Sequence, residues 1–495
     1  MHLSTFAFAV TLAHRISACS FLVANFVVDE GRLASANELS KRRGPDATAR
    51  AYLNGWLVLH NLLWMTGDFR MQPFLEQRNG GKISAAAVFN GEIYNFKELL
   101  PDQTVSSDGQ VLIPTYRTFD KAFGEQFDGE YAVVILDFLA QRMLLLTDPF
   151  GTKPLFYGYG AGGKFAVSSY RSALVGIGLL SSNIIQVDPN TLLTASFHEL
   201  QNFHAAMPRQ NSMEPDRLRY LPASAWPFER QFPVFKWDLR QYKQTADDWI
   251  ASFISAVDKR TRTLLWPAYV GLSDGYDTGA IHLALSLLNI SHRTFTIEGN
   301  EDMDIVQKRL THGSQYEATI ISANETLKLP YLQWLVRHAE PFEYDPPSKG
   351  ICYRDNAAVG TAIIFQKCKQ VGVKVYLSGT GGDEIISDYA FRGKKRYPAS
   401  DFSGMFPQDL ETIFPWRNFY FGQMRNYLMK EESVAGAFGI ETRYPFLDRH
   451  VVQEYLSLDA GLKNSEYKYP VHAFFQHHKW PYVARKNGFN LEKVA

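Results

Sequence analysis

The sequence has little of three features that would place it in other classes of protein. Only three cysteines occur in 495 residues, Cys19, Cys352 and Cys368, which excludes a disulfide framework and is typical of a reducing compartment. The formal net charge is +0, so no broad basic surface indicates nucleic acid as a partner. No apolar run is long enough to span a bilayer. We therefore predict a cytoplasmic protein with neither nucleic-acid nor membrane partners.

Length and composition are those of an ordinary globular protein with more than one domain. Hydrophobic residues make up 46% of the chain and charged residues 21%, and 495 residues favour two or three domains. Between residues 206 and 240, prolines recur among Arg, Gln and Ser without a steady period, which is typical of a linker. We predict an extension or propeptide at 1–18, a first domain at 19–205, this linker, and a second domain at 241–495.

The first eighteen residues resemble a secretion signal only in part. Their apolar run has no Lys or Arg before it, and His14 and Arg15 interrupt its end, which argues against secretion. The alternative is that Cys19 is the first residue of the mature protein. Small and apolar residues alternate from Cys19 to Phe26, as they do in a half-buried strand.

The stretch from Val270 to Gly279 joins an apolar run to a helical pattern through small and polar residues. This order predicts a strand, a tight loop and a helix, and Gly275 allows the backbone to turn where a side chain would block it. The first free N–H groups of a helix that begins near Thr278 would point into the loop and create an anion site. Asp277, at the end of the loop, is suited to hold a magnesium ion on bound phosphates.

The segment Ser273-Asp274-Gly275-Tyr276-Asp277-Thr278 resembles the Ser-Gly-Gly-x-Asp-Ser pyrophosphate loop of ATP-pyrophosphatases, which split ATP into AMP and pyrophosphate. Thr278 replaces a Ser and keeps the hydroxyl, whereas Asp274 replaces a Gly and adds a negative charge beside the phosphates. The resemblance implies that the contacts to ATP come from Leu272, Ser273, Gly275, Asp277 and Thr278.

Three motifs of the first half occur in a characteristic order: Arg43-Gly44-Pro45-Asp46, Asn90-Gly91-Glu92-Ile93-Tyr94-Asn95 and Ser107-Asp108. This series resembles the N-terminal glutaminase domain of glutamine-hydrolysing asparagine synthetase, an αββα sandwich of the N-terminal-nucleophile class. The resemblance implies that Cys19 is the nucleophile and that its own α-amino group is the base. It also implies an oxyanion hole formed by Asn90 and Gly91, a glutamine site with Asp108 and Glu92, and a structural role for Arg43.

Two features depart from an active glutaminase. Cys19 has no free amine unless residues 1–18 are removed. The family's His-Glu-Arg-Leu is His60-Asn61-Leu62-Leu63 here, so Leu62 replaces the Arg that grips the glutamine carboxylate. Arg70 lies nearby in sequence as a substitute. The alternative for Cys19 is a small buried hydrophobe in a retained fold.

A second strand and Gly-rich loop occur in the second half, where Val373 to Leu377 lead into Ser378-Gly379-Thr380-Gly381-Gly382-Asp383-Glu384. The alternation of strands and helices predicts a doubly wound α/β domain. The loop resembles Ser-Gly-Glu-Gly-Ser-Asp-Glu of asparagine synthetase, which implies ATP contacts from Ser378 and Gly379 and makes Asp383 a magnesium ligand beside Asp277. Thr380 replaces the family's Glu, which is implicated in ammonia attack and whose work as a base Thr cannot do.

Two blocks near the C-terminus complete the resemblance. The run Phe438 to Asp448 resembles the family's Gly-x-Glu-x-Arg-x-Pro-Phe-Leu-Asp and is interpreted mainly as structural. Lys468 matches a Lys that faces the adenylate and pyrophosphate, where a cation would stabilise the charge on the leaving group. The resemblance therefore covers nearly the whole chain from Cys19 onward.

The resemblance implies an N-terminal-nucleophile sandwich, or class II glutamine amidotransferase domain, followed by a doubly wound α/β ATP-pyrophosphatase domain. The implied enzyme uses ATP and Mg²⁺ to adenylate a carboxylate such as L-aspartate and transfers ammonia from glutamine; a homodimer is left open. One alternative is a glutamine-independent amide or β-lactam-type ligase or cyclase with a degenerate glutaminase domain, favoured by Leu62, Thr380 and the extension. Another is an inactive member that binds nucleotide or partners, favoured by Asp274.

Overall fold

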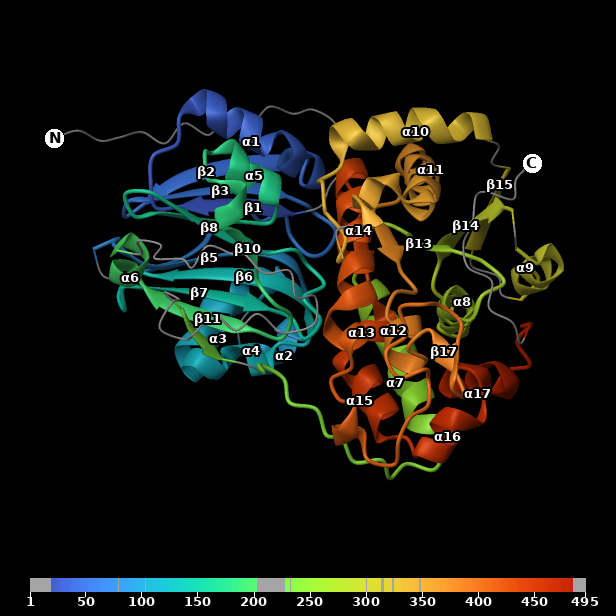
Figure 1. The fold of residues 1–495 in the computed structure, drawn as a ribbon. Coiled ribbons are helices and arrows are strands. Elements are labelled where there is room, and N and C mark those ends of the chain that lie inside the picture. The colour runs from blue at the N-terminus through green and yellow to red at the C-terminus, as the bar shows by residue number, and fades with distance from the viewer. Residues whose placement is uncertain are drawn as a thin grey trace.

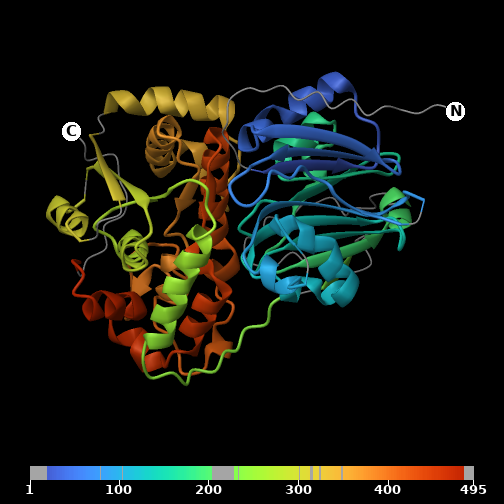
Figure 2. The ribbon, with the colours of Figure 1, turned by 180° about the vertical axis from the view of Figure 1, so that it is seen from behind.

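The computed structural model describes residues 19–483, except for 79, 103, 203–227, 232, 300, 313–315, 323–324 and 347–348. The predicted extension at 1–18 and most of the predicted linker lie outside the described residues. Figures 1 and 2 show two halves side by side, joined at their lower edges by a segment that leads into helix α7 (Asp247–Thr261). No helix in the described part of the chain is long and apolar enough to cross a membrane.

The first half contains two six-stranded antiparallel sheets that lie face to face (Figure 1). One sheet has the order β10-β8-β9-β1-β3-β2, with β1 (Ser20–Ala24), β2 (Ala47–Leu53), β3 (Trp56–Leu62), β8 (Phe156–Gly160), β9 (Lys164–Ser168) and β10 (Ile184–Gln186). The other has the order β12-β11-β7-β6-β5-β4, with β4 (Phe74–Gln77), β5 (Ile83–Ile93), β6 (Gly129–Asp137), β7 (Arg142–Thr147), β11 (Leu192–Ser196) and β12 (Glu229–Gln231).

Helices cover the outer faces of both sheets (Figure 1). The first sheet is covered by α1 (Glu30–Arg43) and α5 (Arg171–Gly176), and the second by α2 (Phe96–Leu99), α3 (Leu112–Phe119) and α4 (Phe123–Gln126), with α6 (Phe197–Asn202) at the side. Successive residues of β1 point to opposite faces, so Phe21 and Val23 enter the core between the sheets while Leu22 and Ala24 face the helices. The predicted αββα sandwich is therefore confirmed.

The second half is built on a five-stranded parallel sheet of order β15-β14-β13-β16-β19, with a small hairpin of β17 and β18 beside it. The strands are β13 (Ala268–Gly271), β14 (His292–Glu298), β15 (Tyr316–Ser322), β16 (Val375–Leu377), β17 (Ala390–Phe391), β18 (Lys394–Lys395) and β19 (Glu441–Arg443). Besides α7, the helices are α8 (Tyr276–Leu287), α9 (Met303–Leu310), α10 (Glu325–His338), α11 (Asn356–Gln370), α12 (Gly382–Ile386), α13 (Arg417–Tyr420), α14 (Gly422–Phe438), α15 (Arg449–Ser457), α16 (Ala460–Ser465) and α17 (Tyr469–His477).

Alternating residues of β13 show why helices pack on both faces of this sheet. Ala268 and Val270 belong to the core formed with α7 and α8, whereas Tyr269 belongs to the core formed with α11 and α14. The predicted doubly wound domain is confirmed, although α8 begins at Tyr276 rather than near Thr278. The strand order reverses between β13 and β16, and in such sheets ligands bind at the carboxyl ends of the strands beside that reversal.

Helix α14 runs along the boundary between the halves, and buried charges join them there (Figures 1 and 2). Arg43, the last residue of α1, donates from Nη1 to the Glu432 carbonyl at 3.0 Å and pairs through Nη2 with the Glu432 carboxylate. Lys153 Nζ lies 3.0 Å from Glu432 Oε1, which also accepts from the Tyr444 hydroxyl. Burial alone would raise the pKa of Glu432, but Arg43 and Lys153 hold it below the usual range.

A second buried pair crosses the same boundary. Arg260 of α7 lies 2.7 Å from Glu130 of β6 and 2.8 Å from Asp448, and Glu130 also accepts from the Tyr444 backbone N–H. The structural role predicted for Arg43 thus belongs to a wider set of ion pairs that fixes one half against the other.

We predict that Glu432→Ala lowers the free energy of unfolding by about 3–5 kcal/mol, because it leaves Arg43 buried without its counter-charge and removes the nearer of the two carboxylates beside Lys153. The control is Glu30→Ala, which breaks an exposed ion pair with Arg50 and should cost less than about 1 kcal/mol. Urea unfolding followed by fluorescence measures both variants, and equal unfolding midpoints would contradict the prediction.

Candidate active sites

Two loops meet at the carboxyl ends of β13 and β16, where the strand order reverses. Asp277 comes from the start of α8 and Asp383 from the start of α12, and both carboxylates contact the ammonium of Lys468. Lys468 Nζ lies 2.6 Å and 2.8 Å from the two Asp277 oxygens and 3.0 Å from Asp383 Oδ1. The Tyr467 hydroxyl donates to the same Asp383 oxygen at 3.0 Å. Three residues predicted from separate motifs are therefore brought together at one point.

Hydroxyl groups and one arginine shape the first loop. The Ser273 backbone N–H donates to Thr278 Oγ1 at 3.2 Å, and the two hydroxyl oxygens lie 2.8 Å apart. The Gly275 N–H donates to Ser273 Oγ at 3.1 Å. Arg309 of α9 donates to the carbonyls of Ser273 and Gly275 at 2.5 Å and 2.8 Å, which turns these oxygens toward the guanidinium. Leu272, the remaining predicted ATP contact here, is buried beneath the loop.

Glycine is required where the two loops touch. A Cβ on Gly382 would lie 2.3 Å from Asp277 Oδ1, and one on Gly379 would lie 2.8 Å from Asp277 Cβ. Any larger residue at either position would force the Asp277 side chain to shift, so the Gly-rich second loop lets the carboxylates approach each other. Ser378, also predicted to contact ATP, is fully buried at the start of this loop.

The carboxylate of Asp274 is bound at the start of α9. Asp274 Oδ2 accepts from the Asp302 N–H at 3.2 Å, and the Asp274 N–H donates to Glu301 at 2.9 Å. Burial, together with the nearby Asp274, raises the pKa of Glu301 to about 8. Glu301 therefore keeps its proton at neutral pH, which limits the repulsion that Asp274 would otherwise introduce.

The donor set at Lys468 suits a hard divalent cation. Mg²⁺ is commonly held by one or two carboxylates together with substrate phosphates, and Asp277 and Asp383 are two such carboxylates converging on a positive charge. No group of three or more His, Cys, Asp or Glu able to hold a metal occurs among the described residues. Burial opposes the charge on Lys468, but Asp277 and Asp383 raise its pKa, so the ammonium stays protonated.

Cys19 lies directly before β1, with its thiol enclosed by the end of β3. The Leu63 N–H donates to Cys19 Sγ at 3.2 Å, and the Cys19 carbonyl accepts from Arg43 Nε at 3.0 Å. Burial raises the pKa of the Cys19 thiol, and Glu441, Asp108 and Glu92 raise it further. The thiol is therefore protonated at neutral pH and needs a base to become a nucleophile.

Asn90 and Gly91 lie near the end of β5, the strand next to the edge strand β4 of the second sheet. The Asn90 side chain is fully buried, and neither its nitrogen nor its oxygen has a hydrogen-bond partner within the described ranges. Gly91 has φ +124°, and a Cβ there would lie 1.8 Å from the Glu130 carbonyl oxygen. A buried amide without partners is suited to bind a ligand that supplies them, as the predicted oxyanion hole requires.

The two predicted glutamine contacts have different environments. Asp108 accepts from the N–H groups of Ile93 and Gly109, each at 2.9 Å, and burial raises its pKa to about 6. Glu92 lies 2.8 Å from Arg443 of β19, and burial raises its pKa. One side of this site is therefore built by the second half of the chain.

The position of the missing family arginine is apolar. Leu62 is buried in the same hydrophobic cluster as Cys19. Arg70, the predicted substitute, donates to Ser106 Oγ at 3.3 Å, two residues before Asp108, and its guanidinium is about half exposed. A cation from a distant part of the sequence thus contacts Ser106, close to Asp108 in the chain.

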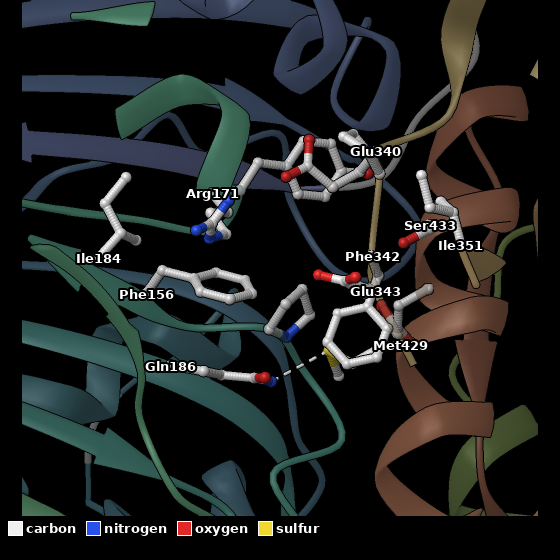
Figure 3. Close-up of a pocket in the computed structure, with 14 residues that line it drawn as sticks. Phe156, Arg171, Ile184, Gln186, Glu340, Phe342, Glu343, Ile351, Met429 and Ser433 are labelled. Atoms are coloured by element: carbon white, nitrogen blue, oxygen red, sulfur yellow. Dashed lines mark hydrogen bonds between the residues drawn. The ribbon is translucent and has the colours of Figure 1, made fainter. Parts of the chain in front are cut away.

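A cavity of about 430 Å³ lies at the boundary between the halves and is lined by Glu432 among others. Figure 3 shows Phe156 and Gln186 from the first half facing Met429 of α14 across it, with Arg171 and Glu343 reaching into the space. Gln186 Nε2 lies 3.1 Å from Met429 Sδ. None of the predicted site residues lines this cavity. The boundary between the halves is closely packed at the ion pair of Arg43 with Glu432 and leaves a cavity beside that pair.

Sequence reasoning missed Arg309, Glu301 and Glu431, which contact the two nucleotide loops. Arg309 and Glu301 belong to no motif. Glu431 and Glu432 are consecutive acids in an α14 sequence whose other side chains are mostly buried. Adjacent carboxylates in a buried helix are a signal of partners elsewhere in the fold, and this signal could have been used.

Comparisons with known proteins agree with this geometry. The glutamine amidotransferase domain model matches residues 18–215, and the asparagine synthase model matches residues 251–416 and 417–486. The glutamine-hydrolysing asparagine synthetase of Bos taurus is 25% identical over 448 residues, which cover 85% of this chain and 73% of the relative. That of Gallus gallus is 25% identical over 472 residues, which cover 88% and 76%.

Among solved structures, the glutamine phosphoribosylpyrophosphate amidotransferase of B. subtilis covers 61% of this chain and 81% of its own at 13% identity. Its TM-score of 0.32 is too low to support an inference. The fold, the matched domains and the curated relatives define an ATP-using carbon–nitrogen ligase with an amidotransferase half. The chain belongs to the family of glutamine-hydrolysing asparagine synthetases.

We predict that Gly382→Ala weakens the binding of magnesium-ATP about 10- to 100-fold, because the new Cβ displaces Asp277 from its charged contacts. Titration calorimetry measures the dissociation constant. The matched control is Gly31→Ala in the exposed first turn of α1, where the nearest atom would be 3.3 Å away. Unchanged affinity in Gly382→Ala would show that the close approach of the loops is not needed.

Proposed function

We propose that this ligase converts L-aspartate, glutamine and ATP into asparagine, glutamate, AMP and pyrophosphate. The observation that carries the proposal is the convergence of Asp277, Asp383 and Lys468 at the strand-order reversal. The names of the relatives support aspartate as the acceptor. We assign glutamine hydrolysis to residues 19–205 and adenylation to residues 241–495.

The adenylation half activates the acceptor carboxylate. Asp277 and Asp383 would hold Mg²⁺, which would neutralise the triphosphate. Lys468 supplies a fixed positive charge beside the leaving pyrophosphate. The remaining predicted ATP contacts enclose the phosphates through hydroxyl and backbone groups: Leu272, Ser273, Gly275, Thr278, Ser378 and Gly379. A carboxylate oxygen of the acceptor attacks the α-phosphorus, and pyrophosphate leaves.

The glutaminase half releases ammonia. With residues 1–18 removed, the α-amino group of Cys19 takes the thiol proton, which the buried thiol does not lose unaided at neutral pH. The sulfur attacks the glutamine side-chain amide, and Asn90 with the Gly91 N–H stabilises the oxyanion. Asp108 binds the α-amino group of glutamine, and Glu92 lines the same pocket. Ammonia leaves, and water later cleaves the thioester.

We predict that protein beginning at Cys19 releases ammonia from glutamine, whereas protein retaining residues 1–18 does not. Cys19→Ala should abolish glutamine-dependent asparagine formation and leave formation from ammonium chloride within about threefold of wild type, because only the first half uses the thiol. Mass spectrometry of the N-terminus identifies the natural first residue. If Cys19→Ala still released ammonia from glutamine, Cys19 would not be the nucleophile.

We predict that Arg70→Gln raises KM for glutamine about 10- to 100-fold, because a guanidinium bond to the glutamine carboxylate contributes about 1.5–3 kcal/mol. The kcat with ammonium chloride should not change, since Arg70 lies on the first half. Arg78→Gln, another arginine of the first half, is the matched control. An unchanged KM for glutamine in Arg70→Gln would show that Arg70 does not bind the glutamine carboxylate.

A second candidate is a glutamine-independent amide or β-lactam-type ligase or cyclase, favoured by the buried, apolar Leu62 at the position of the family arginine. It predicts pyrophosphate release with a carboxylate and an amine but no ammonia release from glutamine, even when the chain begins at Cys19. A complete absence of ATP–pyrophosphate exchange with carboxylates would favour an inactive, nucleotide-binding member instead.

A further inference from the structure

Glu431 of α14 reaches the loop that follows β16. The Ser378 hydroxyl donates to Glu431 Oε2 at 2.6 Å, and the Thr380 hydroxyl donates to Glu431 Oε1 at 3.1 Å. Both oxygens of one carboxylate are therefore bound to hydroxyls of a single Gly-rich loop. The same loop leads to Asp383 at Lys468, so Glu431 lies beside the nucleotide site without being part of it.

Thr380 stands where the family's loop carries a Glu, so the loop itself has no base at this position. Glu431 brings a carboxylate from a different element to this position, where it accepts a hydrogen bond from Thr380. Thr380 is the donor in its bond to Glu431. The lone pairs of Thr380 Oγ1 are therefore able to accept a hydrogen bond from another donor.

The surroundings of Glu431 adjust its proton affinity to neutral pH. Burial raises the pKa of Glu431 to about 7, while its bonds to Ser378 and Thr380 and the neighbouring cation Lys430 oppose the rise. Other titratable groups that interact electrostatically with Glu431 are Glu384, Tyr269, Tyr376 and Tyr444. A carboxylate with this affinity both accepts a proton and releases it near pH 7.

We propose that Glu431, acting through the Thr380 hydroxyl, accepts the proton that the attacking amine loses during amide formation. The inference rests on the proposed function. The nitrogen lone pair forms a bond to the acyl carbon of the adenylate, and the nitrogen passes one proton to Thr380 Oγ1. Thr380 passes its own proton to Glu431 Oε1. The carbon–oxygen bond to phosphate then breaks, and AMP leaves with the electron pair. Glu431 is thus a positioning residue that acts through Thr380.

The test separates the two half-reactions on protein that begins at Cys19. ATP–pyrophosphate exchange with L-aspartate reports adenylation, which needs no base for an amine. Asparagine formation from ammonium chloride, at constant free ammonia, reports the second step. In Glu431→Gln we expect exchange within about threefold of wild type and asparagine formation reduced about 100-fold. The wild-type rate should rise with pH through about 7, and this rise should be absent in Glu431→Gln.

Two further variants distinguish proton transfer from support of the fold. Thr380→Ser keeps the hydroxyl and should stay within about threefold of wild type in both assays. Thr380→Val removes it without changing charge and should lose asparagine formation to the same extent as Glu431→Gln. Glu411→Gln, an exposed acid of the same half, is the matched control and should change neither assay.

Three outcomes would overturn the inference. The first is unchanged asparagine formation in Glu431→Gln with an unchanged pH profile. The second is equal loss of exchange and asparagine formation in both Glu431→Gln and Thr380→Val, which would indicate a structural role only. The third is no exchange with aspartate in the wild type, which would remove the proposed function and this inference with it. Selective loss of the second step supports both.

Discussion

The buried carboxylate of Glu432 is the charge on which the relative placement of the two sites depends. Removing a carboxylate from water is costly unless its lone pairs are matched, and Arg43, Lys153 and Tyr444 match them here. Arg43 also holds the carbonyl of Cys19, and the residue beside Glu432 on α14 holds the loop at Ser378. A single turn of α14 therefore contacts the loop at Ser378 directly and reaches the Cys19 carbonyl through Arg43. A shift of one half against the other would leave these buried charges unpaired. The ion pairs therefore favour a single arrangement of the two halves.

At the nucleotide site, sheet topology and glycine act together. Parallel strands bring the starts of α8 and α12 to one edge, and the strand-order reversal separates the helices that follow. Two carboxylates brought this close repel each other, and Lys468 removes the repulsion. The glycines at 379 and 382 make this approach sterically possible.

The fold and the meeting of Asp277 with Asp383 could be predicted, because local patterns and the resemblance of the motifs to a known family indicate them. The pattern from Cys19 to Phe26 predicted the strand β1, although the strand is buried on both faces rather than half-buried. Apolar runs that end in Gly-rich loops indicated where Asp277 and Asp383 lie. Contacts between distant segments could not be predicted in this way: Arg43 and Glu432 are 389 residues apart, and no period or motif links them. Asp274 illustrates the same limit, since its accommodation depends on Glu301, and Glu431 could be understood only once its distance to Thr380 was known.

The first half keeps one residue of the family's glutaminase motifs, Asn90, and has lost another, the arginine replaced by Leu62. These two residues affect the stability of the fold differently. Asn90 keeps a fully buried amide with no partner within the described chain, which costs about 1–3 kcal/mol per unpaired group. An apolar residue of similar shape would avoid that cost, so the unpartnered amide favours a ligand-binding role for Asn90. Leu62 carries no such cost in stability, because its apolar side chain packs in the same hydrophobic core as Cys19. The amide of Asn90 is therefore kept at a cost in stability, whereas the apolar side chain at Leu62 offers no contact to a carboxylate.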